Sequence, residues 1–87
     1  MYSSVKRFLK QTSNHDLMVE YASHRIMGEE PPPEISKRIA QALGRHMRRP
    51  TQRNLKRFFI LCLGVVYQEI REAGRNRESD VESADVC

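Results

Sequence analysis

Apolar residues recur every three or four positions along most of this 87-residue chain, and this spacing is what most constrains its fold. One face of an α-helix repeats at that interval, whereas a half-buried strand alternates apolar and polar residues. The sequence has no such alternation between turn signals and no internal repeat. It therefore predicts an all-α protein, a compact bundle of about four helices.

Capping and turn residues set the limits of the first two predicted helices. A short first helix begins at Ser3 or Ser4, whose hydroxyl groups can cap it. Ser13, followed three residues later by Asp16, indicates a capping-box start for a second helix. Gly28 is the expected end of this second helix, since glycine readily adopts the left-handed conformation that terminates helices.

Proline, threonine and glycine limit the last two predicted helices. Pro33 suits the first turn of a third helix, and Pro50 ends that helix by residue 49. Thr51 then caps a long fourth helix, for which Gly74 is the expected stop. The longest apolar run in the chain, residues 58–67, is about half of the roughly 20 residues that cross a bilayer, so we expect no membrane insertion.

The predicted fourth helix carries apolar residues on most of its sides, and three shorter helices can leave part of it uncovered. Two interpretations stay open: a central core helix, or a helix that associates through its uncovered side in a homodimer. Gly64 would allow a second helix to approach closely. The alternative function is thus a protein–protein interaction module, an adaptor or inhibitor, and its contact residues would be Phe58, Phe59, Leu63 and Tyr67.

Basic residues are concentrated in one block of the sequence that contains no acid. The eight basic residues of this block are Lys37, Arg38, Arg45, Arg48, Arg49, Arg53, Lys56 and Arg57. A solvated face that keeps the domain soluble is the plainer explanation. However, a block without acids fits contact with phosphates better than an ion-pair network. We therefore predict a small regulatory or accessory nucleic-acid-binding protein that uses these eight residues to contact DNA or RNA.

Helical spacing gives this basic block a predicted shape. One face of the third helix collects four polar residues spaced three, four and three apart: Arg38, Gln41, Arg45 and Arg48. Three more cations lie in the first two turns of the fourth helix: Arg53, Lys56 and Arg57. Because the positive end of the helix dipole disfavours cations, their presence there favours a role in binding anions over a role in stability.

The stretch Ile-Ala-Gln-Ala-Leu-Gly at residues 39–44 resembles the first helix and glycine turn of helix-turn-helix DNA-binding proteins. The resemblance covers six residues and implies a turn at Gly44. Arg45 stands where that family has an apolar residue, and Pro50 falls where its recognition helix is continuous. The family's base-reading positions are therefore not transferred, and the minor-groove face of double-stranded RNA fits at least as well.

The end of the chain has the opposite charge. Its last ten residues carry four acids and no Lys or Arg, so residues 1–77 hold a net charge of +8 against +4 for the whole chain. We expect a helical domain over residues 1–74 and a disordered acidic tail over residues 75–87. As a hypothesis, this tail folds back on the arginine face and competes with nucleic acid.

No sequence motif indicates catalysis, a cofactor or a metal centre. The glycines are isolated, so a phosphate-cradling loop is not expected. His15, His24 and His46 share no ligand spacing with a cluster of Cys or acids. Cys62 and Cys87 form neither a disulfide framework nor a metal motif, which suits a reducing compartment. We expect a non-enzymatic intracellular protein of the cytoplasm or nucleus.

Overall fold

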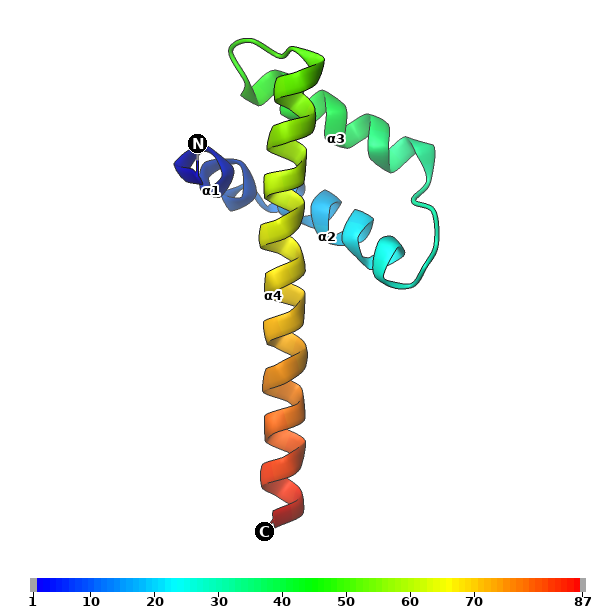
Figure 1. Ribbon diagram of the computed structural model, residues 1–87, viewed down its shortest axis with the longest axis vertical. Coiled ribbons are helices and arrows are strands. Elements are labelled where there is room, and N and C mark those ends of the chain that lie inside the picture. The colour runs from blue at the N-terminus through cyan, green and yellow to red at the C-terminus, as the bar shows by residue number, and fades with distance from the viewer. Residues whose placement is uncertain (1, 87) are drawn as a thin grey trace.

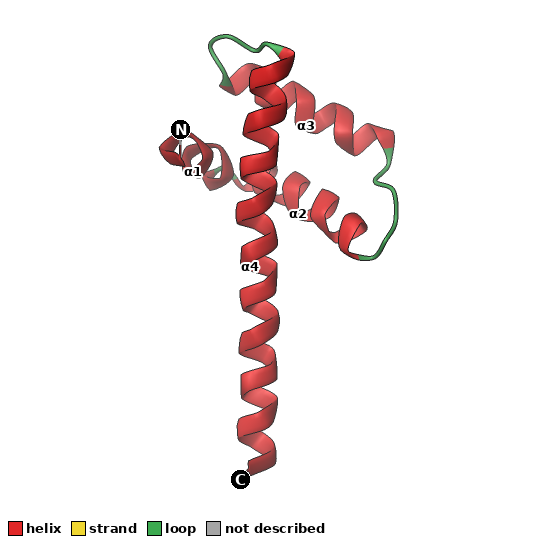
Figure 2. Ribbon diagram, in the orientation of Figure 1, coloured by secondary structure: helices red, strands yellow, loops and turns green. Residues whose placement is uncertain are grey.

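The computed structural model is all-α, as predicted, and describes the backbone of residues 2–86 and the side chains of residues 3–74. Its four helices, in chain order, are α1 (Tyr2–Lys10), α2 (Thr12–Ile26), α3 (Pro33–His46) and α4 (Gln52–Val86). Figure 1 shows their arrangement, and Figure 2 shows that the rest of the described backbone forms loops.

Helix α4 is the axis of the molecule. At 1.5 Å per residue its 35 residues span about 52 Å, close to the longest dimension of the molecule, 55 Å. The three shorter helices gather around its N-terminal half, and α2 contacts α1, α3 and α4 (Figure 1). Within the described backbone, none of the helices combines the length and the unbroken apolar character needed to cross a bilayer.

The core lies where the four helices meet, and each helix contributes apolar residues to it. The buried apolar residues are Val5, Phe8 and Leu9 of α1, Met18 and Ala22 of α2, Ile35, Ile39, Ala42 and Leu43 of α3, and Phe58, Cys62 and Val66 of α4. Cys62 is fully buried, and this burial raises the pKa of its thiol from 9.0 to about 12. It therefore serves as a small apolar core residue.

Two predicted helix limits are confirmed. The backbone of Gly28 has a φ of 75°, the left-handed conformation expected at the end of α2. The amide of Glu29 donates to the carbonyl oxygen of His24 at 2.8 Å, which closes the last turn of α2. Pro33 is the first residue of α3, where its lack of an amide hydrogen costs nothing.

The predicted start of the second helix is wrong. Helix α2 begins at Thr12, directly after α1, and no side chain caps it, so the capping box of Ser13 and Asp16 does not form. Because only Gln11 separates α1 from α2, Ser13 already lies inside the first turn of α2 and cannot be its N-cap. Gly44 lies inside α3, as the predicted third helix requires, and so the glycine turn of the helix-turn-helix family is absent from the described backbone.

Helix α4 continues to Val86, past the stop predicted at Gly74. Gly28 is the only described glycine with a positive φ, so Gly74 keeps a helical backbone. A single glycine weakens a helix by about 1 kcal/mol relative to alanine but removes none of its hydrogen bonds. The acidic tail predicted over residues 75–87 lies outside the residues whose side chains are described.

Candidate nucleic-acid interface

All eight basic residues of the predicted block are exposed to solvent. Arg38 is the only one of them that forms an ion pair with a described residue. Its Nη2 atom donates to Oε1 of Glu34 at 3.1 Å, one turn earlier on α3. An exposed pair of this kind contributes only about 0.3 to 0.5 kcal/mol. The block is therefore not neutralised by carboxylates within the described part of the chain.

The part of the block on α3 has two members fewer than predicted, because Arg48 and Arg49 lie beyond the end of α3. Lys37, Arg38 and Arg45 are exposed on α3, whose buried face carries Ile39 and Leu43. Arg45 lies in the last helical turn, where the negative end of the dipole also stabilises a cation.

The fourth member of the predicted stripe lies outside the helix. Helix α3 ends at His46, and Met47 has an extended backbone with a ψ of 140°. This extended residue starts the turn of the chain toward α4. Arg48 therefore lies in the connecting loop and not on the face of α3.

The basic residues of α4 are exposed near its N-terminus, where the sequence placed them. The first turn of α4 contains no acid, so Arg53 lies close to the uncompensated positive end of the helix dipole. Arg57 follows one turn later. Lys56 lines an apolar groove of about 260 Å³ between α2, α3 and α4, whose walls include Leu43 and Phe59. The described residues that line this groove include none of the cations of α3.

Hydrogen bonds fix the loop that carries Arg48 and Arg49. The carbonyl oxygen of Arg49 accepts from the amide of Thr51 at 2.9 Å and from Nδ2 of Asn54 at 3.4 Å. The Oγ1 atom of Thr51 accepts from the backbone amide of Asn54 at 3.2 Å and caps α4 as predicted. The backbone between the two helices is thus tied to the start of α4.

An aromatic cluster of Phe8, His46 and Phe58 joins the end of α3, where this loop starts, to α1 and α4. The ring of His46 lies 5.4 Å from that of Phe8 on α1 and 5.5 Å from that of Phe58 on α4, measured between centroids. The two phenyl rings meet edge to face at 5.7 Å, a favourable arrangement for aromatic pairs. His46 is therefore half-buried and joins α1 to the α3–α4 connection.

This packing creates a basic hollow of about 810 Å³ between α1 and the α3–α4 loop. We call it the arginine hollow: Arg7 of α1 lines it together with Arg48 and Arg49 of the loop, and none of the described residues that line it is an acid. Sequence reasoning missed Arg7, because its place here depends on Phe8 packing against His46. The only feature of the sequence that could have identified Arg7 as a site residue was its position beside the apolar face of the first helix.

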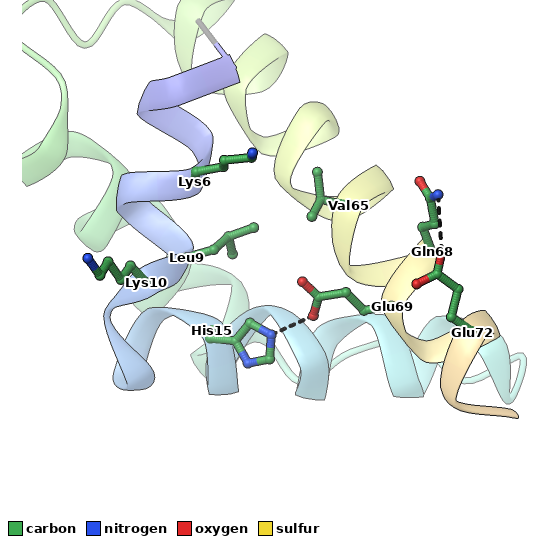
Figure 3. A pocket seen from close by; sticks show the side chains of 8 residues that line it. All are labelled: Lys6, Leu9, Lys10, His15, Val65, Gln68, Glu69 and Glu72. Carbon is green, nitrogen blue, oxygen red and sulfur yellow. Dashed lines mark hydrogen bonds and ion pairs between the residues drawn. The ribbon is translucent and has the colours of Figure 1, made fainter. Parts of the chain in front are cut away.

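A second hollow has a mixed charge and is a poorer site for a polyanion. It measures about 390 Å³ and lies between α1, α2 and α4 (Figure 3). Lys6 and Lys10 line it together with Glu69 and Glu72. Nε2 of His15 lies 2.7 Å from Oε2 of Glu69, a contact that ties α2 to α4. Acids and bases in similar number leave this surface without a strong positive potential.

The apolar residues predicted to contact a protein partner are mostly turned toward the core. Phe58 is 5% exposed and belongs to the core, so it is not available at the surface. The other three, Phe59, Leu63 and Tyr67, are half-buried and pack against the core. The outward apolar residues of α4 are instead Ile60, 57% exposed, and Leu61, 39% exposed.

Among the described residues, no three His, Cys, Asp or Glu side chains lie close enough together to hold a metal ion. Comparison with known proteins gives no relative for this chain: no family model matches it, and neither a curated protein nor a solved structure shows significant similarity to it.

Proposed function

We propose that this protein binds nucleic acid, as a small regulatory or accessory protein, through the basic residues of α3, the α3–α4 loop and the start of α4. The single observation that supports this most is the exposure of all eight basic residues, of which Arg38 alone is paired with a described carboxylate. Exposed cations on α3, on the α3–α4 loop and at the start of α4 attract a polyanion, whose phosphates repeat along its length.

The residue types of the block favour phosphate contacts over diffuse attraction. Six of its eight cations are arginines. The planar guanidinium group donates two parallel hydrogen bonds to a phosphate, whereas a lysine ammonium acts as a point charge. Arginine also donates to the edge of guanine in the major groove. The same residues therefore suit both the backbone and the bases of DNA or RNA.

Binding to duplex DNA, duplex RNA and single strands, titrated at several salt concentrations, tests this function. If the block neutralises six phosphates, the logarithm of the association constant falls against the logarithm of salt with a slope of about −5 for a duplex. This steep slope arises because each neutralised phosphate releases a condensed counterion. Absence of binding to all three, or a slope near zero, contradicts the proposal.

A second candidate function is contact with another protein through the outer side of α4. Ile60 and Leu61 are exposed there, and a side chain added at Gly64 would meet nothing within 4 Å. Exposed apolar residues beside an accessible glycine suit close approach of a second helix, as in a homodimer. Cations of the block would then lie on both protomers.

For this second candidate we expect Ile60→Asp to convert a dimer into a monomer, because it places a charge in an apolar contact. Sedimentation velocity at micromolar concentration measures the change. Gln41→Asp introduces the same charge at an exposed position of α3, not of α4, and should leave the dimer intact. A wild-type protein that sediments as a monomer at all concentrations would exclude self-association.

A further inference from the structure

We infer that the arginine hollow binds a terminal phosphate of a nucleic-acid strand. This inference rests on the proposed function and specifies which chemical group of the nucleic acid binds in the hollow. The hollow is a concave part of the surface. Its lining residues come from α1, the end of α3, the α3–α4 loop and the start of α4. A strand end protrudes and can enter such a hollow, whereas an internal phosphate lies along a continuous backbone.

The charge of the hollow selects the phosphate type. Three arginines, Arg7, Arg48 and Arg49, line it, and none of its described lining residues is an acid. A phosphomonoester carries a charge of about −1.5 to −2 near pH 7 and three acceptor oxygens. An internal phosphodiester carries a single charge. The terminal phosphate therefore matches three arginines better than an internal phosphate does, because it has more negative charge and more oxygen atoms that accept hydrogen bonds from guanidinium groups.

The hollow is also preorganised. Both hydrogen bonds to the Arg49 carbonyl oxygen hold the loop backbone, and the contact between Phe8 and His46 holds α1 against the end of α3. Arg7 and the loop arginines are therefore presented by backbones that need little reordering when an anion binds. A site with this property gains affinity because less conformational entropy is lost on binding.

Two DNA hairpins that differ only in their 5′ end, one phosphorylated and one with a 5′ hydroxyl, test this inference. Fluorescence anisotropy at 150 mM salt should show the phosphorylated hairpin binding about tenfold more tightly, as expected for added charge-assisted hydrogen bonds. Arg7→Gln should abolish this difference between the two hairpins. Lys10→Gln, the same loss of charge on α1 outside the hollow, should keep the difference.

The outcomes separate this inference from the proposed function. Equal affinity of wild-type protein for the two hairpins overturns the terminal-phosphate site and leaves nucleic-acid binding standing. If neither hairpin binds, the proposed function fails, and 5′-AMP against adenosine then decides the inference. A rise in melting temperature with 5′-AMP, absent with adenosine and lost in Arg7→Gln, supports a phosphate site in the hollow. The same measurement with inorganic phosphate shows whether the nucleoside is needed, and no shift with either anion overturns the inference.

Discussion

Replacing Arg45, Arg48 and Arg49 together by glutamate is expected to weaken binding to duplex DNA or RNA by about 100-fold or more at 100 mM salt. Each change removes a guanidinium group that donates hydrogen bonds to a phosphate and places a negative carboxylate near that negative phosphate. All three side chains are exposed, so the variant should remain folded with the same helix content. Anisotropy titration measures the affinity, and circular dichroism checks the fold.

A matched variant separates the effect of position from that of net charge. Lys10, Arg25 and Arg71 are also exposed, lie on α1, α2 and α4, and line no part of the arginine hollow. Their joint replacement by glutamate changes the net charge by the same amount. We expect a loss of affinity below about tenfold, from long-range electrostatics alone. An equal loss in both triple variants would mean that the block has no special part in binding.

The Phe8→Ala variant is expected to lose about 3 to 5 kcal/mol of unfolding free energy, as large-to-small changes of buried aromatic residues do. Phe8 is 1% exposed, and its ring contacts those of His46 and Phe58. A domain of this size has a total stability of about 5 to 15 kcal/mol, so this loss is a large share of it. Urea unfolding followed by circular dichroism measures the difference.

Ile60→Ala is the matched control for that variant. Ile60 is 57% exposed on the outer side of α4, so its truncation leaves no cavity and should cost less than about 0.5 kcal/mol. A loss in Ile60→Ala of the monomeric protein as large as that in Phe8→Ala would show that α4 buries the side that carries Ile60.

The buried faces of the helices could be predicted from the sequence because periodicity depends on local geometry. Ile35, Ile39 and Leu43 recur every four residues and form the buried face of α3, and Gly28 and Pro33 identified neighbouring helix limits. Residue chemistry at these positions leaves few alternatives, since glycine accepts a positive φ and proline fits a first turn.

The composition of the arginine hollow could not be predicted, because it depends on how the helices pack. Arg7 is distant in sequence from Arg48, and they share a hollow only because α1 packs on the end of α3. The end of α3 at His46 was also missed, since the residues before Pro50 are compatible with a helix that runs to 49. That error of a few residues moved Arg48 from the helix face into the loop.

The central claim is that the arginines at the α3–α4 connection contact phosphates of a bound nucleic acid. The most direct test compares the salt dependence of duplex binding for wild-type protein and for the variant with glutamate at Arg45, Arg48 and Arg49. Each phosphate contact that is lost reduces the log–log slope by about 1, so the account predicts a slope shallower by about 3 in the variant. An unchanged slope would contradict it, because the three arginines would then neutralise no phosphate.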